Sequence, residues 1–237
     1  MKIGFLQLDV AFEKIDRNIQ RVQELLEPVE FDLMVLPELF ATGCIFYNKQ
    51  HAFSLSEPVP EGKISQSIID IARKKNAWII AGILERDGDR MYNSAIVAGP
   101  QGYLGKHRKV NLSMGEEDRF CGGDGYETFL INGVTVGILI CVDNERAEAG
   151  EILAGKCVRL ICQPANHQGV DMLDTFRAIS EKNGVYTMSS NRVGFDHDTG
   201  LNTPFIGLSQ IIDPDGRILH QAPENEESLY IMDLDLE

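Results

Sequence analysis

The stretch Gly133–Glu148, GVTVGILICVDNERAE, decides both the fold and the chemistry that the sequence predicts. Its first part is an apolar run rich in Val and Ile, typical of a buried strand, and this run ends on Cys141. Three acids, Asp143, Glu145 and Glu148, follow within seven residues of the thiol. Only a thiolate is a good nucleophile, and nearby negative charge raises a thiol pKa above the ~8.5 of free cysteine. Cys141 is therefore either an inert core residue or a nucleophile whose acidic neighbours are offset by a cation from elsewhere in the chain.

Strand and helix patterns alternate along the rest of the chain, whose 237 residues fit a single α/β domain. Residues 2–10, for example, place Ile3 and Phe5 on one face and Leu6 and Leu8 on the other, as a strand does. We expect helices within residues 14–29, 63–76, 144–155 and 171–183. We expect strands within residues 31–38, 77–86, 91–99, 102–110, 126–133, 134–141, 158–163, 185–191, 205–213, 216–221 and 228–235. Such alternation, with hairpins mixed in, predicts mixed β-sheets covered by helices.

Composition and charge exclude several functional classes. Hydrophobic residues make up 43% and charged residues 24%, which is typical of a globular protein. The net charge of −14 disfavours binding to nucleic acids or to anionic membranes. No apolar run approaches the ~20 residues that span a bilayer, and residues 1–12 lack a signal-peptide pattern, so we expect a cytoplasmic protein. The five cysteines include no CxxC pair and the histidines form no HxH or HExxH pattern, so no metal site is predicted.

Two other positions suit a catalytic partnership with Cys141. Glu38 follows a predicted strand and Pro37, and Lys109 lies at or just after the end of another strand. Catalytic groups often lie at strand ends, where the scaffold holds them in place. A carboxylate can act as general base to the thiol, and an ammonium can stabilise the oxyanion that forms when a carbonyl is attacked. Taken alone, Lys109 could be a surface lysine, as most lysines are.

The chain resembles the nitrilase (carbon–nitrogen hydrolase) superfamily, in its amidase-like branch, over almost its whole length. The segment LPELFATG is similar to the family's glutamate motif and implies Glu38, and HRKVNL is similar to its lysine motif and implies Lys109. GILICVDNERAE is similar to the cysteine motif and implies Cys141. In the family a second glutamate lies three residues before a phenylalanine, and by position in EDRF this is Glu117. Further matches are EDRFCGGD, QPANH, SSNRVG and IIDPDGRIL.

The resemblance implies one carbon–nitrogen hydrolase domain over residues 1–237, built as an α-β-β-α sandwich of two mixed β-sheets covered by helices. It also implies a homodimer or a higher homo-oligomer. The implied chemistry is hydrolysis of a carbon–nitrogen bond in a small linear amide or carbamoyl compound, without metal or organic cofactor. Glu38 takes the thiol proton, Cys141 forms a thioester, and Lys109 with the backbone N–H of Val142 holds the oxyanion. Glu117 helps Glu38 to activate water, and Lys109 offsets the acids near the thiol.

Three residues are expected to contact the substrate: Val142, Asn166 and Glu145. The last stands where the family often has an arginine. Because acids are close to Cys141 in the sequence, we expect a neutral or amine-bearing substrate rather than a dicarboxylate.

Three alternatives stay open at this point. One is a Cys–His pair with His167, which would need Asn166 or a carboxylate to orient its imidazole. Another is a non-catalytic member of the family that binds a metabolite or a partner. The third is hydrolysis of a nitrile by the same thiol.

Overall fold

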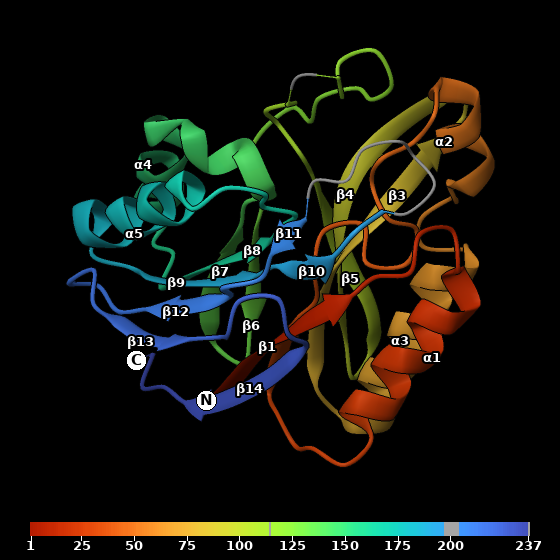
Figure 1. The fold of residues 1–237 in the computed structure, drawn as a ribbon. Coiled ribbons are helices and arrows are strands. Elements are labelled where there is room, and N and C mark those ends of the chain that lie inside the picture. Colours follow the sequence, from red (N-terminus) through yellow and green to blue (C-terminus); the bar gives the residue numbers. More distant parts are fainter. Residues whose placement is uncertain (114, 197–203, 237) are drawn as a thin grey trace.

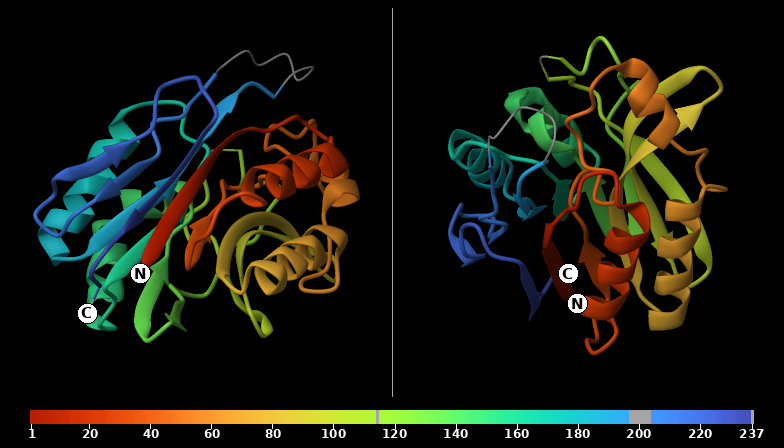
Figure 2. Two further views of the ribbon diagram at one scale, coloured as in Figure 1. Left: turned by 90° about the horizontal axis from the view of Figure 1, so that it is seen from below. Right: turned by 45° about the vertical axis from the view of Figure 1, so that its right-hand side comes forward.

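Two mixed β-sheets lie face to face between two layers of helices in the computed structural model, which describes residues 1–113, 115–196 and 204–236 (Figure 1). Helices α1 (Ile15–Leu26) and α3 (Lys63–Lys75) cover one outer face, and α4 (Ala147–Gly155) and α5 (Asp171–Asn183) cover the other (Figure 2). This arrangement confirms the α-β-β-α sandwich that the resemblance implied. Within the described ranges, no helix has the length and apolar character needed to cross a bilayer.

The first sheet has eight strands in the order β11-β10-β1-β2-β3-β4-β5, with β14 paired to β1. Strands β1, β2 and β3 are parallel, whereas β3, β4 and β5 form an antiparallel meander. The bounds are β1 Lys2–Asp9, β2 Leu33–Val35, β3 Trp78–Asp87, β4 Arg90–Gly99, β5 Gly102–Arg108, β10 Arg192–Gly194, β11 Phe205–Ile206 and β14 Ser228–Asp233. The pairing of β14 with β1 could not be predicted. The sequence pattern of residues 228–233 indicates a strand, but it does not indicate which sheet the strand joins.

The second sheet has six strands in the order β13-β12-β9-β8-β7-β6. Its centre, β7, β8 and β9, is parallel, and its two margins are antiparallel. The bounds are β6 Thr128–Ile131, β7 Val134–Ile138, β8 Leu160–Pro164, β9 Tyr186–Ser190, β12 Gln210–Ile212 and β13 Ile218–Gln221. The apolar run of Val134–Ile138 is thus a buried central strand, as its composition predicted.

The core is divided into layers by the alternation of side chains along the strands. In β1, Ile3 and Phe5 pack between the two sheets, while Leu6 and Leu8 pack under α1 and α3. This confirms the two faces predicted for residues 2–10. The layer between the sheets contains side chains from β2 and β7 as well, and it brings the carboxyl ends of these strands close together. These strand ends carry the residues singled out in the sequence.

Several elements differ from the prediction. The strand expected within residues 205–213 is divided into β11 and β12, which lie in different sheets, and β10 was not predicted. The helix expected within residues 144–155 begins at Ala147, because Cys141–Glu145 forms a short 3₁₀-helix, η1, directly after β7. A further helix, α2 (Lys49–Leu55), was not predicted. It has an Asn48 cap that accepts from the N–H of His51 at 2.9 Å, and an asparagine followed by a polar run is a weak signal in a sequence.

Candidate active site

Three strand ends meet at one cavity of about 330 Å³. Glu38 follows β2 and Lys109 follows β5, both in the first sheet, whereas Cys141 follows β7 in the second sheet. All three line the cavity, although they are far apart in the sequence. The sandwich therefore places a carboxylate, an ammonium and a thiol together, as the three motifs predicted.

Glu38 is held in place by a close backbone approach to β3. The N–H of Gly82 donates to the carbonyl of Pro37 at 3.2 Å, and the N–H of Phe40 donates to the carbonyl of Gly82 at 3.1 Å. A Cβ on Gly82 would lie 2.5 Å from Cα of Glu38, well inside van der Waals contact. Only glycine therefore lets the Glu38 segment lie this close to the strand.

Gly82→Ala is expected to lower kcat about 10- to 100-fold, because the added methyl group pushes the backbone of Glu38 away from the other reacting groups. Activity on the best amide and thermal unfolding should be measured together. The matched control is Gly155→Ala at the end of α4, where an added Cβ has nothing within 4 Å. Wild-type kcat in Gly82→Ala would show that the close approach does not position Glu38.

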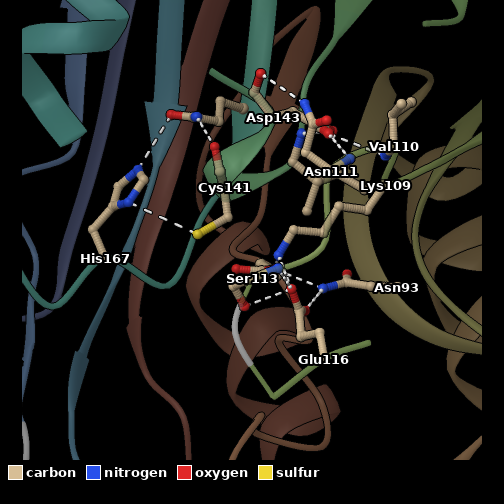
Figure 3. A network of polar contacts seen from close by, with 12 residues as sticks. Asn93, Lys109, Val110, Asn111, Ser113, Glu116, Cys141, Asp143 and His167 are labelled. Atoms are coloured by element: carbon tan, nitrogen blue, oxygen red, sulfur yellow. Dashed lines mark hydrogen bonds and ion pairs between the residues drawn. The ribbon is translucent and has the colours of Figure 1, made fainter. Parts of the chain in front are cut away.

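Lys109 lies buried between two carboxylates (Figure 3). Its Nζ is 2.9 Å from Oε1 of Glu38 and 2.7 Å from Oε2 of Glu116. Asn93 on β4 joins the same network, because its Nδ2 donates to Glu38 at 2.6 Å and to Glu116 at 2.9 Å. Ser113 completes it by donating to Glu116 from its backbone N–H at 2.8 Å and from its hydroxyl at 2.7 Å. Each of the two acids thus has a fixed orientation.

The charges in this network determine which group can take a proton. Burial acts to lower the pKa of Lys109, but the charges of Glu38, Cys141 and Glu116 raise it well above its usual value, so Lys109 stays an ammonium. Burial acts to raise the pKa of Glu116, but Lys109 and Ser113 bring it below the usual range, so Glu116 stays a carboxylate. For Glu38, burial raises the pKa and outweighs the effect of Lys109. Oε2 of Glu38 is buried without a hydrogen-bond partner among the described residues, so it is available as a proton acceptor.

The position of the second glutamate corrects the prediction by one residue. Glu117 was predicted, but its side chain is exposed on the surface of the loop. Glu116 contacts Lys109 instead, four residues before Phe120. The N–H of Phe120 donates to the carbonyl of Glu116 at 2.8 Å, so this segment forms a helical turn. The conformation of this turn decides which acid faces Lys109. A run of neighbouring acids such as Glu116, Glu117 and Asp118 does not reveal that conformation in the sequence.

Cys141 occupies a strained turn at the start of η1. Its φ of +45° lies in the left-handed region, which costs a residue other than glycine roughly 1–2 kcal/mol. Its carbonyl accepts from Nε2 of Gln163 at 2.8 Å, which holds the turn from the neighbouring strand. Strain at a non-glycine residue often marks a functional position, and here it is found at the thiol that lines the cavity.

Asp143 joins the cysteine turn to the end of β5. Its Oδ2 accepts from the N–H of Ile140 at 2.9 Å. Its Oδ1 accepts from the N–H groups of Val110 at 3.0 Å and Asn111 at 2.7 Å (Figure 3). This carboxylate is therefore bonded to backbone amides directly after Lys109 and cannot face the thiol. It positions Cys141 relative to Lys109.

The charges that shift the pKa of Cys141 come from other segments of the chain and not from the acids that follow it in the sequence. Burial raises the pKa of Cys141 far above its usual range, and Glu38 raises it further, while Lys109 and the backbone N–H of Asn166 lower it. Glu145 and Glu148 are exposed on the surface. Lys109 does act on the thiol as a cation, as expected, but the acids whose effect it offsets are Glu38 and Glu116 and not those that follow the cysteine. At neutral pH, Cys141 is a protonated thiol.

Of the three residues predicted to contact the substrate, the structure places the side chain of only one on the cavity wall. Asn166 lines the cavity, and its Nδ2 and Oδ1 are buried without hydrogen-bond partners in the described part of the chain, so both are free for a ligand. Val142 is half-buried and packs against the apolar layer between the sheets. Glu145 lies away from the cavity, beside Ala178 and Lys182 of α5. The prediction that Glu145 contacts the substrate therefore has no support in the geometry.

His167 lies close to the thiol but is a poor base. Its Nδ1 is 3.8 Å from Sγ of Cys141, and its Nε2 is 3.4 Å from Oε1 of Gln163 (Figure 3). Burial, with a smaller contribution from Lys109, lowers the pKa of His167 to about 3. The imidazole is therefore neutral at physiological pH, and such a weak base draws the thiol proton poorly. Gln163, rather than Asn166, contacts its second nitrogen.

Comparison with known proteins agrees with this geometry. A family model described as carbon–nitrogen hydrolase matches residues 2–237. The chain is 35% identical over 242 residues to a nitrilase of Pyrococcus abyssi, covering 100% of this chain and 90% of that protein. It is 29% identical over 242 residues to an (R)-stereoselective amidase of a Pseudomonas species, covering 100% of this chain and 86% of that protein. A carbon–nitrogen hydrolase from Helicobacter pylori G27 has the same fold, with a TM-score of 0.90 at 23% identity and coverage of 100% and 89%. The chain belongs to the carbon–nitrogen hydrolase family.

Proposed function

We propose that this protein hydrolyses the carbon–nitrogen bond of a small linear amide or carbamoyl compound through a thioester on Cys141. The observation that supports this most is the position of Lys109 between two carboxylates, in the cavity that the thiol also lines. Burying an ammonium and two acids is costly, and packing alone does not require it. Every step proposed below uses only side chains and one backbone N–H of this chain, together with water.

In the first step, Sγ of Cys141 attacks the amide carbon while its proton passes to Oε2 of Glu38. Since burial raises the thiol pKa far above its usual range, the proton moves as the S–C bond forms, not before it. The carbonyl oxygen becomes an oxyanion, which Lys109 stabilises by charge and the backbone N–H of Val142 by a hydrogen bond. Glu116 keeps the ammonium in place, so it acts as a positioning residue.

In the second step, Glu38 returns the proton to the amide nitrogen, the C–N bond breaks, and ammonia or an amine leaves. Water then loses a proton to Glu38 and its oxygen attacks the thioester carbon. The S–C bond breaks, and the sulfur of Cys141 takes the proton back from Glu38. Glu38 takes up one proton and gives one back in each half-reaction, so a single carboxylate suffices for all proton transfers. Both half-reactions use the same oxyanion donors.

The test is ammonia release from a panel of small amides, carbamoyl compounds and nitriles, with wild type and Cys141→Ala measured side by side. Release by wild type alone is expected. Equal release from both proteins would mean that Cys141 only packs the core. The Cys141→Ala protein should be checked by circular dichroism, so that a loss of activity is not a loss of fold.

A second candidate reaction is nitrile hydrolysis, which the 35% identity to a nitrilase favours. Cys141 would attack the nitrile carbon, and Glu38 would supply a proton to the nitrogen, so the same residues would act. The panel separates the two reactions. Faster ammonia release from a nitrile than from the amide of the same chain would favour the nitrile, and the reverse would favour the amide.

A further inference from the structure

A second cation lines the cavity apart from Lys109. The guanidinium of Arg119 is held by two backbone carbonyls, since Nη1 donates to Gly115 at 2.5 Å and Nη2 donates to Phe46 at 3.2 Å. The side chain is half-buried. Carbonyl oxygens fix the orientation of a guanidinium but carry no formal charge, so the positive charge of Arg119 is not neutralised by them.

The charged groups that the structure describes around the cavity leave Arg119 without a counter-ion. Lys109 already has two carboxylates, and Glu116 is fully used by Lys109, Asn93 and Ser113. Among residues 1–113, 115–196 and 204–236, no carboxylate lies within ion-pair distance of Arg119. A pre-oriented guanidinium on the wall of a cavity is a favourable site for a planar carboxylate, which it binds through parallel hydrogen bonds.

Arg119 is also fixed relative to the reacting groups. Its backbone N–H donates to the carbonyl of Glu116 at 2.9 Å, so Arg119 lies on the same turn as the acid that holds Lys109. This turn and the two carbonyl contacts therefore hold the guanidinium on the wall of the cavity that Cys141 and Lys109 also line. Ile45 and Phe205 add apolar wall to the same cavity, which suits a short methylene chain.

We propose that Arg119 binds a carboxylate at the end of the substrate opposite to the amide, so that the preferred substrates are monoamides of short dicarboxylic acids. This inference rests on the proposed function and names its substrate class. It replaces the sequence-based expectation of a neutral or amine-bearing substrate, which depended on acids that the structure places elsewhere. Asp143 is bonded to backbone amides, and Glu145 and Glu148 are on the surface.

Binding and turnover test different parts of this proposal. Calorimetry with glutaramate on Cys141→Ala measures the carboxylate site with no chemistry involved. Adding Arg119→Gln is expected to raise Kd about 10- to 100-fold, since a charge-assisted hydrogen-bonded pair is lost, and Arg119→Lys is expected to recover part of the affinity. Arg217→Gln, which removes an exposed arginine of the turn before β13, is the matched control and should leave Kd unchanged. An unchanged Kd in Arg119→Gln would overturn the proposal even if the protein were inactive.

Turnover is compared as the ratio of kcat/KM for two substrates on the same protein sample. This ratio does not depend on the fraction of protein that is active. Succinamate is compared with isocaproamide, in which an isopropyl group replaces the carboxylate, and with γ-aminobutyramide, in which an aminomethyl group replaces it. Wild type is expected to have the highest kcat/KM on succinamate, and the succinamate-to-isocaproamide ratio should fall 10- to 100-fold in Arg119→Gln. The wild-type preference should also shrink at high salt, because salt screens the ion pair. A wild-type preference for γ-aminobutyramide would overturn the proposal while leaving amide hydrolysis by Cys141 intact.

Discussion

Glu38→Gln is expected to lower kcat for amide hydrolysis about 10²- to 10⁴-fold while the protein stays folded. Glutamine keeps the shape of the side chain and an oxygen for the hydrogen bonds from Lys109 and Asn93. It cannot accept the thiol proton, and Cys141 cannot ionise without help because its pKa is so far raised. The expected size is that of losing a general base. Steady-state ammonia release, with circular dichroism as a check of folding, measures the effect.

The same variant should change the dependence of activity on pH. Burial raises the pKa of Glu38 above its usual range, and the base must be a carboxylate to act. Wild-type kcat/KM is therefore expected to fall as pH drops through that raised value, above the ~4.3 of an ordinary glutamate. Glu38→Gln should lose this acid limb. His167→Asn is the matched control, because an imidazole with a pKa of about 3 is not the base, so the acid limb should persist. Full activity in Glu38→Gln, together with a large loss in His167→Asn, would instead favour the Cys–His pair.

The three central residues could be predicted from the sequence because each ends a strand. A strand is recognised from its apolar pattern, and the polar residue that follows it has to lie at the edge of a sheet. Glu38, Lys109 and Cys141 obey this rule in β2, β5 and β7. Which edges meet across the two sheets is a property of the sandwich, and only the resemblance to a family supplied it.

Other members of the site were missed because their signal is weak. Glu116 lies in a loop, which lacks the repeating pattern that shows which side chains of a helix or strand point inward. The sequence therefore predicted Glu117 instead of Glu116. Asn93 lies within the strand β4, where the expected pattern is apolar. A buried polar residue in such a strand has to find a partner, and this would have been a reason to single out Asn93. The spacing of residues along the sequence does not show where the side chain of Arg119 points or which groups it contacts.

The acids after Cys141 show the same limit. Distance along the chain suggested that Asp143, Glu145 and Glu148 act on the thiol, yet a 3₁₀-turn rotates successive side chains in different directions. Asp143 is turned toward backbone amides and the other two toward solvent. The charges that matter for the thiol arrive from other strands, and they can be known only when the strands are placed.

Lys109→Met is expected to reduce both activity and stability, and the two losses have the same origin. Removing the ammonium takes away the charged oxyanion donor, which should lower kcat about 10²- to 10³-fold. It also leaves the buried Glu38 and the partly buried Glu116 without their cation. Breaking a buried pair costs about 3–5 kcal/mol, so Tm should fall by about 10 °C for a chain of this size.

The pH dependence of this loss identifies its cause. Without Lys109, the pKa values of both buried carboxyls lie above their unfolded values, so the folded protein binds more protons than the unfolded chain. Stability is then lost as pH rises from the unfolded pKa through the raised folded pKa, and the Tm difference from wild type should be larger at pH 8 than at pH 5. Lys106→Met, in the strand β5 that directly precedes Lys109, is the matched control, because its partner Glu85 keeps Arg108. It should destabilise the protein less and retain activity. An equal Tm difference at both pH values would mean that Lys109 stabilises the protein by packing its methylene chain rather than by pairing with the two acids.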